Sequence, residues 1–253
     1  MKLESLMRMW QGPLSRVFGL NNMVGTRNDA YRATWVEQKL RDIPVGSRLL
    51  DAGAGEQRFR KFCGHLRYVA QDFGRYDGKG DLAGLHTQEW SQMNLDIVSD
   101  ITVIPEPNES FDAILCTEVL EHVPDPIAAL KELSRLLRRD GTLVLTAPFC
   151  SLTHFAPFHF YSGFNRYFFE HHLKRFGFEI LEIKTNGNFF EYIAQEVRRL
   201  PDVASRYGGG RLSYGEKIAM QILLRSFGRM SAFGDGSSEL LNFGFYVLAR
   251  KAK

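Results

Sequence analysis

The sequence has few cysteines, no long apolar run and no large excess of either charge. Its three cysteines, Cys63, Cys116 and Cys150, show no C-x-x-C spacing, which argues against structural zinc and a disulfide framework. No apolar run reaches the roughly 18 residues of a membrane span, and the N-terminus lacks a signal-peptide core before a small-residue cleavage site. Together these absences predict a cytoplasmic protein with reduced thiols.

The net charge of the chain bears on whether nucleic acid is a partner. The 32 Lys and Arg against 29 Asp and Glu leave a net charge of +3, so nucleic acid is not an expected partner.

Within residues 1–29, apolar side chains recur at helical spacing with basic ones between them, which predicts an N-terminal helical segment. That helix packs on the chain as a lid, forms a homodimer contact or touches a membrane surface, and packing is favoured over membrane binding.

Short apolar strands alternate with helical stretches through residues 30–186. The patterns predict strands at 48–50, 67–71, 111–116, 142–146, 178–184 and 243–250, and helices at 31–40, 58–63, 126–138 and 166–176. This alternation is typical of an α/β fold with a doubly wound, mostly parallel sheet that binds ligands at its carboxyl edge. Helices at 189–200 and 214–227 form a predicted helical cap insertion over 187–241, before residues 242–253 close the core.

The stretch LLDAGAGEQRFR, residues 49–60, joins a buried strand to a glycine turn. Gly53 and Gly55 let a ligand approach the backbone, and Asp72 follows about 20 residues after the turn, where a carboxylate binds ribose hydroxyls. Asp51 precedes the glycines and would repel a pyrophosphate, which disfavours a nicotinamide dinucleotide. A carboxylate there suits a ligand with an ammonium and a sulfonium, as in S-adenosylmethionine.

Four motifs carry a resemblance: LLDAGAGEQ, Asp72, the pair Asp100-Ile101, and CTEVLEHVPDP at 116–126. They resemble the class I S-adenosylmethionine-dependent methyltransferases with a Rossmann-like fold, in the branch of ubiquinone-type O-methyltransferases and polysaccharide-cluster methyltransferases. The likeness covers about 31–184, and residues 147–178 are similar to the polysaccharide group. It implies that S-adenosylmethionine is the cofactor and S-adenosylhomocysteine the product. The implied cofactor-binding residues are Asp51, Gly53, Gly55, Gln57, Asp72, Phe73, Asp100, Ile101, Cys116, Thr117 and Glu118.

Within this set, the resemblance implies that the glycine turn surrounds the methionine part of the cofactor and that Asp72 binds the ribose. Gln57 departs from the pattern, because a third glycine often occupies its position. Glu118 and His122 lie four residues apart, a spacing that would place both on one helical face and suits a metal. No third ligand is visible in the sequence, so we expect no metal there, and the resemblance makes His122 a helix-orienting residue.

Two histidines in an aromatic-rich loop are the candidate catalytic bases. His154 and His159 follow the strand at 142–146, and a histidine can remove a hydroxyl proton near neutral pH. The candidate acceptor-binding residues around them and in the cap are Phe155, Tyr161, Asn165, Arg166 and Tyr192. Aromatic rings would stack on an acceptor ring or sugar face. The structural alternative is a hydrophobic plug whose histidines are hydrogen-bonded for packing.

The sequence therefore predicts a methyltransferase that O-methylates a glycan, a sugar or a glycan precursor by in-line methyl transfer. One alternative is an O-methyltransferase of a quinone-type phenol, or of another small molecule, at a membrane surface. Another is a non-catalytic scaffold that binds the cofactor. The expected partner is accordingly a small-molecule or glycan acceptor.

Overall fold

The computed structural model describes residues 23–76, 78, 84–85, 94–233 and 236–252. The predicted helix near the N-terminus lies outside these residues. The chain forms two compact units. The larger unit contains 29–186 and the described residues from 242 onward, and the smaller contains 187–241 with the described end of 1–28.

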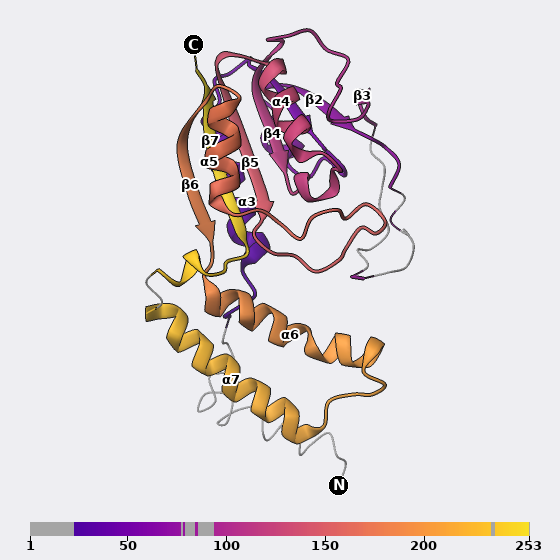
Figure 1. Cartoon of the computed structure of the whole chain (residues 1–253), viewed down its shortest axis with the longest axis vertical. Coiled ribbons are helices and arrows are strands. Elements are labelled where there is room, and N and C mark those ends of the chain that lie inside the picture. Colours follow the sequence, from indigo (N-terminus) through magenta and orange to yellow (C-terminus); the bar gives the residue numbers. More distant parts are fainter. Residues whose placement is uncertain (1–22, 77, 79–83, 86–93, 234–235, 253) are drawn as a thin grey trace. The chain divides into compact units, whose positions relative to one another are not determined.

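The larger unit is built on a seven-stranded sheet (Figure 1). Its strands are β1 (Arg48–Ala52), β2 (Arg67–Asp72), β3 (Ile97–Val98), β4 (Phe111–Thr117), β5 (Leu137–Pro148), β6 (Phe178–Asn186) and β7 (Gly244–Lys251). They lie in the order β3-β2-β1-β4-β5-β7-β6. β7 runs antiparallel to both of its neighbours, β5 and β6, and the other strand pairs of this sheet are parallel. The predicted doubly wound, mostly parallel sheet is thereby confirmed.

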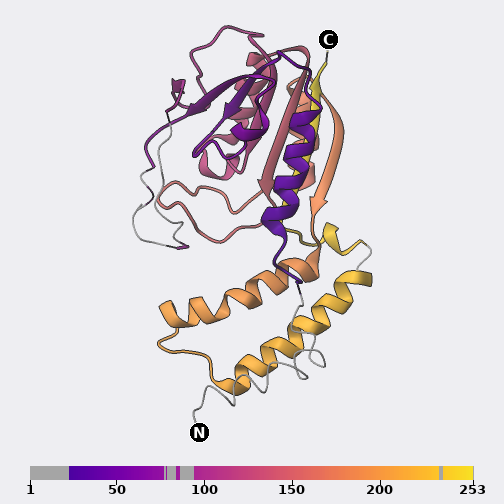
Figure 2. The same ribbon diagram turned by 180° about the vertical axis from the view of Figure 1, so that it is seen from behind.

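Alternating side chains of the central strands fill a separate core on each face of the sheet. Leu50 of β1 packs in the core that contains α4 (Pro126–Leu136) and α5 (Arg166–Arg175), whereas Leu49 packs in the core with α3 (Asn28–Arg41). Figure 1 shows α4 and α5 in front of the sheet, and Figure 2 shows α3 in front of the opposite face. Successive strand residues point to opposite faces, so a central strand covered on both faces carries apolar side chains on both.

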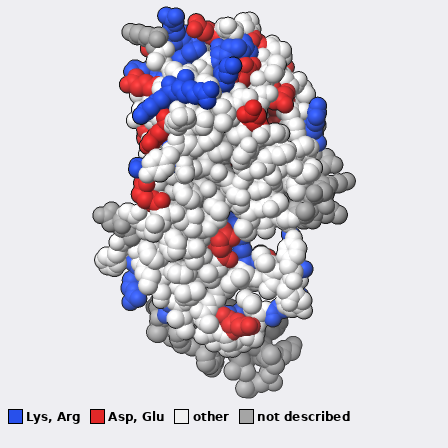
Figure 3. Space-filling model, in the orientation of Figure 1, with Lys and Arg blue, Asp and Glu red and all other residues white. Residues whose placement is uncertain are grey.

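The two edges of the sheet have different characters. At the amino ends of the strands, ion pairs join Arg48 to Glu106 and Arg138 to Asp112. Figure 3 shows Lys and Arg mixed with Asp and Glu at that end of the larger unit. At the carboxyl ends, strand order reverses between β1 and β4, and such a switch point is where doubly wound sheets bind ligands.

Three local predictions were wrong. Residues 58–63 form only a single 3₁₀ turn, η1 (Arg60–Phe62). Gln57, which precedes them, has a left-handed φ of 54°, so no helix runs from the glycine turn into this segment. Glu118 and His122 do not share a helical face, since Glu118 has φ of 52° and only η2 (Leu120–His122) follows it. Strand β5 begins at Leu137, before its predicted start.

The smaller unit pairs α6 (Phe189–Tyr207) with α7 (Tyr214–Phe233) around a small core. Asn188 caps α6 by accepting a hydrogen bond from the Glu191 backbone N–H at 3.1 Å, and its Nδ2 donates to the Ser231 carbonyl of α7 at 3.2 Å. None of the described helices has the length and apolar character needed to cross a membrane.

Candidate functional site

A cavity of about 630 Å³ opens at the carboxyl ends of β1, β2 and β4. This size is typical of a small-molecule or cofactor site. Nine of the predicted cofactor-binding residues line it, and they are Asp51, Gly53, Gly55, Asp72, Phe73, Asp100, Ile101, Thr117 and Glu118. The structure therefore brings together residues from four separate sequence motifs at one sheet edge.

Backbone N–H groups and the Asp72 carboxylate hold the glycine turn in place. The N–H groups of Gly53 and Ala54 donate to the Gln71 carbonyl at 2.9 and 2.8 Å. Those of Gly55 and Gly74 donate to the two Asp72 carboxylate oxygens at 3.0 and 2.9 Å. A carboxylate has about four lone-pair sites, so Asp72 keeps acceptor capacity toward the cavity. Asp72 thus both organises the turn and remains able to accept hydrogen bonds from a ribose.

Gly53 cannot be replaced without strain. Its φ is +76°, and a Cβ at this position would lie 2.5 Å from Cγ2 of Val119. A glycine is required where the backbone is left-handed and another side chain approaches this closely. The turn therefore keeps a bare backbone against the cavity.

Asp51 is buried in the wall of the cavity and accepts a hydrogen bond from the Tyr68 hydroxyl. Burial raises the pKa of Asp51 to about 7, against the lowering effect of the Tyr68 hydrogen bond, and the Asp72 charge raises it further. Burial thus makes the ionised form of Asp51 costly, and a positively charged ligand beside the carboxyl would favour that form.

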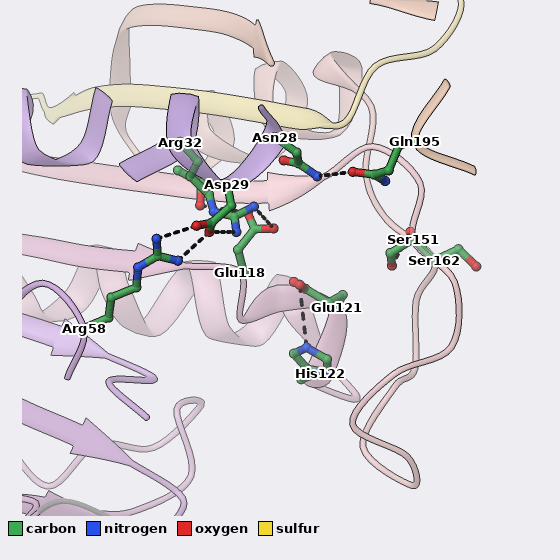
Figure 4. Close-up of polar contacts among 11 residues, drawn as sticks. Asn28, Asp29, Arg32, Arg58, Glu118, Glu121, His122, Ser151, Ser162 and Gln195 are labelled. Atoms are coloured by element: carbon green, nitrogen blue, oxygen red, sulfur yellow. Dashed lines mark hydrogen bonds and ion pairs between the residues drawn. The ribbon is translucent and has the colours of Figure 1, made fainter. Parts of the chain in front are cut away.

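Asp29 and Arg32, on the first turns of α3, join a network of arginines and carboxylates that also borders the cavity (Figure 4). Arg32 donates to Glu118 at 2.9 Å and to Asp29 at 3.0 Å, and Arg58 donates to Asp29 at 2.7 Å. The Thr146 hydroxyl donates to the other Glu118 oxygen at 2.8 Å. Sequence reasoning missed Arg32 and Arg58. The signal was available, because a helix antiparallel to β1 begins at the same edge at which β1 ends.

Two predicted cofactor residues do not line the cavity. The Gln57 side chain is buried, donates to the Asn94 carbonyl at 2.8 Å and accepts from Arg60 at 2.7 Å. It therefore stabilises the loop around the turn. Cys116 is fully buried in the core beneath α4, because its side chain points away from that of Thr117. Burial raises the pKa of its thiol.

Aromatic side chains line the cavity on its other side. Phe155 and Phe158, which follow β5, contact side chains that follow β2. The ring centroids lie 4.5 Å apart for Tyr76 and Phe155 and 5.0 Å apart for Phe73 and Phe158. Phe160 also lines the cavity. An acceptor on this side would therefore meet an apolar, ring-shaped surface.

The structure brings one predicted base and one predicted acceptor-binding residue, His154 and Phe155, to the cavity. His159 does not line it, and its Nε2 lies 3.1 Å from the Ser151 hydroxyl. Four predicted acceptor-binding residues also lie elsewhere. Asn165 caps α5, Tyr161 donates to the Pro124 carbonyl, Arg166 donates to the Tyr167 hydroxyl, and Tyr192 is buried in the smaller unit.

His122 lines the cavity although the sequence pointed only to a helix-orienting role. Its Nδ1 lies 2.6 Å from the Phe158 carbonyl, and its Nε2 lies 3.6 Å from a carboxylate oxygen of Glu121 (Figure 4). Burial lowers the pKa of His122 to about 3, with the His154 charge as a second cause. Burial also raises the pKa of Glu121, reinforced by Glu118. His122 is therefore a neutral imidazole in the cavity wall.

Comparison with known proteins identifies the family. Residues 26–183 match the family described as a methyltransferase domain. A ubiquinone biosynthesis O-methyltransferase of Xanthomonas campestris pv. campestris (strain B100) is 34% identical over 102 residues, covering 40% of this chain and 43% of the relative. Its counterpart in Xanthomonas oryzae pv. oryzae (strain PXO99A) is 31% identical over 149 residues, covering 57% and 58%. The chain thus spans about half the length of the curated relatives it matches.

Solved structures support the fold. The cyclase SpnF superposes with a TM-score of 0.52 and 16% sequence identity, covering 87% of this chain and 80% of that chain. Structural similarity at this level of sequence identity supports the fold alone, because one fold supports many reactions. The family match covers most of the larger unit, including the glycine turn and the motif at 116–126. The predicted class I methyltransferase relationship is thereby confirmed, and the chain belongs to the methyltransferase domain family.

Proposed function

We propose that this chain transfers the methyl group of S-adenosylmethionine to an oxygen of a phenolic, quinone-type acceptor. The observation that carries the proposal is one cavity with two unlike sides. Strand ends with a glycine turn and carboxylates form one side, and aromatic rings with imidazoles form the other. The first side suits a nucleoside with a cationic tail, and the second suits a flat apolar ring.

On the cofactor side, Asp72 would accept hydrogen bonds from the ribose hydroxyls, and Asp100 and Ile101 would border the adenine. The buried Asp51 carboxyl would face the cationic methionine part beside Gly53 and Gly55. The Arg32 and Arg58 guanidinium groups reach the same cavity and would attract the methionine carboxylate. These residues fit the group because the glycine turn presents bare backbone and the Asp51 and Asp72 carboxyl groups line the same cavity.

On the acceptor side, the aromatic wall would hold a ring so that its hydroxyl oxygen meets the methyl carbon in line. The bound cofactor supplies a sulfonium methyl group that is electrophilic without further activation. Catalysis then depends mainly on alignment, which Phe155, Phe158 and Tyr76 would provide, and on removal of water. The acceptor oxygen would gain the methyl group and lose its proton to solvent or a nearby base, which would leave the cofactor as a neutral thioether.

The names of the curated relatives favour a phenol as the acceptor over the glycan predicted from the sequence. The curated relatives bear names for O-methylation in ubiquinone biosynthesis. The two acceptor classes differ in what the wall must provide. A phenol ring needs apolar ring surfaces, whereas a sugar also needs polar partners for its hydroxyls. The predicted polar partners Asn165 and Arg166 are not among the residues that line the cavity, which favours the phenol over the glycan.

The test is formation of S-adenosylhomocysteine from S-adenosylmethionine with matched panels of hydroquinones, simple phenols, sugar nucleotides and glycans. We expect product and a methylated ring only with the phenolic panel. Product only with the sugar panel would restore the glycan hypothesis. Tight binding of S-adenosylhomocysteine with no turnover on either panel would favour the cofactor-binding scaffold, and no binding at millimolar concentration would refute the proposal altogether.

A further inference from the structure

Asp51 receives a hydrogen bond from a side chain that is not part of the cavity wall. The Tyr68 hydroxyl donates to Oδ2 of Asp51, and among the described residues this is the one hydrogen bond to the Asp51 carboxyl group. Asp51 lines the cavity, whereas Tyr68 does not. Tyr68 therefore acts on a ligand in the cavity through Asp51 and not by direct contact.

The register of the sheet brings these two side chains together. Strands β1 and β2 pair in parallel, with Leu49 opposite Tyr68 and Asp51 opposite Ala70. Tyr68 and Asp51 are thus diagonal neighbours on one face of the sheet, within reach of a long aromatic side chain. The Tyr68 ring packs against the core that contains Leu49. A phenylalanine at this position would keep the packing and remove the hydroxyl.

Arg60 and Gln57 hold the Tyr68 ring from the segment that follows the glycine turn. The Arg60 guanidinium carbon lies over this ring, 5.5 Å from its centroid, and Nη1 of Arg60 donates to Oε1 of Gln57 at 2.7 Å. A cation over an aromatic face is attracted to the ring. Gln57, at a position where the motif often has a glycine, thereby helps to fix the side chain that binds Asp51.

The other titratable groups around Asp51 leave the hydroxyl as its main support. Among the described residues, the Asp72 carboxylate and the thiols of Cys63 and Cys116 interact with Asp51. Burial raises the pKa of both thiols, so they stay neutral. Burial also raises the pKa of the Tyr68 hydroxyl, which therefore keeps its proton as a donor. The Tyr68 bond favours the ionised carboxyl, whereas burial and the Asp72 charge oppose it.

We propose that Tyr68 is a positioning residue for the cofactor, whose hydroxyl holds Oδ2 of Asp51 and leaves Oδ1 to the cationic methionine part of S-adenosylmethionine. The proposal rests on the cofactor of the proposed function and is independent of the acceptor. An ionised Asp51 attracts a cation, whereas a protonated one does not. A hydrogen bond to a carboxylate changes its ionisation equilibrium by about tenfold. Loss of the hydroxyl should therefore weaken cofactor binding most where ionisation is incomplete.

The test is calorimetric titration of the full chain with S-adenosylmethionine at two pH values. We expect Tyr68→Phe to bind about tenfold more weakly than wild type at about pH 6, where Asp51 is mostly protonated. At about pH 8.5 the carboxyl is ionised in both proteins, so the difference should fall to within about twofold. A loss of packing alone would weaken binding by the same factor at both pH values.

The matched control is Tyr246→Phe. It removes a hydroxyl from the same core, and that hydroxyl has no hydrogen-bond partner among the described residues. Affinity should stay within about twofold of wild type at both pH values. In an Asp51→Asn background, which cannot ionise, Tyr68→Phe should also change affinity by less than about twofold. Circular dichroism establishes that each variant is folded.

A measurement on wild type keeps the proposal testable if Tyr68→Phe does not fold. Cofactor binding at about pH 6 should release about one proton, seen as a dependence of the binding enthalpy on the buffer. Equal losses in Tyr68→Phe at both pH values, no loss at either, or no proton release by wild type would overturn the proposal alone. Absence of binding by wild type at both pH values would overturn the cofactor assignment with it.

Discussion

The two sides of the cavity differ in what holds their side chains. On the glycine-turn side, Asp51, Gly53 and Asp72 sit at the ends of paired strands, where sheet register and backbone hydrogen bonds fix them. On the aromatic side, His154 and Phe155 sit on a loop and are positioned by ring contacts and single carbonyls. The cofactor side is thus built by the topology of the sheet, whereas the acceptor side is built by tertiary contacts. Mutations should affect the two sides differently.

The largest effect is expected from Asp72→Asn. An amide has one acceptor oxygen, so the variant loses a bond to the glycine turn and a charge-assisted bond to the ribose. Loss of two such bonds, roughly 2–3 kcal/mol, weakens S-adenosylhomocysteine binding about 100-fold. Calorimetry measures this, with exposed Asp42→Asn as control. An unchanged dissociation constant would mean that the cofactor side is not organised by Asp72.

The next effect is expected from Gly53→Ala. The left-handed φ and the contact with Val119 should lower the free energy of unfolding by about 2 kcal/mol. Denaturant unfolding measures the loss. Gly64→Ala is the matched control in the same unit, because nothing lies within 4 Å of its position. Equal stabilities for the two variants would contradict the strained-turn interpretation.

A smaller effect is expected from pH. The folded-state pKa of Asp51 is about 7, above the ordinary 3.8. Its contribution to stability is therefore present at acidic pH and is lost as pH rises through about 7. A cationic ligand favours the ionised carboxyl, so affinity for S-adenosylmethionine should rise roughly tenfold between about pH 6 and 7.5. Titration across this range tests it, and Asp51→Asn should abolish the rise. A parallel rise in Asp51→Asn would assign the dependence to another group.

The smallest effect separates two aromatic residues of one loop. Phe155 lines the cavity and Tyr161 does not. Phe155→Ala should raise the acceptor KM about fivefold through lost ring contact, roughly 1 kcal/mol, while cofactor affinity stays unchanged. Tyr161→Ala should leave both constants within about twofold. Initial-rate kinetics on the phenolic acceptor distinguishes them. The opposite ranking would show that the loop presents other rings to the acceptor.

Strand ends explain why the fold and the cofactor side could be predicted. Short apolar runs and the spacing of Asp51, Gly53 and Asp72 determine a parallel sheet and the edge at which its ligand binds. The register of the sheet then fixes the position of each of these residues at the carboxyl edge. Arg32 could have been found by the same reasoning, because α3 begins at the edge where β1 ends.

Loops explain why the remainder could not be predicted. Asn165 and Arg166 were assigned to an acceptor by residue type, but Asn165 caps α5 and Arg166 reaches Tyr167. Gln57 occupies a glycine position in the motif, yet a left-handed backbone turns its side chain into the loop. The meeting of His154 with Glu121 and His122 depends on how one loop folds over another. No sequence period encodes such a contact.

The central claim is that the carboxyl-edge cavity binds S-adenosylmethionine through the glycine turn and Asp72. A crystal structure with S-adenosylhomocysteine bound tests it most directly. The account predicts ribose hydroxyls on the Asp72 carboxylate, the methionine part over Gly53 and Gly55, and the sulfur facing the aromatic wall. Density for the ligand outside this cavity, or a ribose turned away from Asp72, would contradict it.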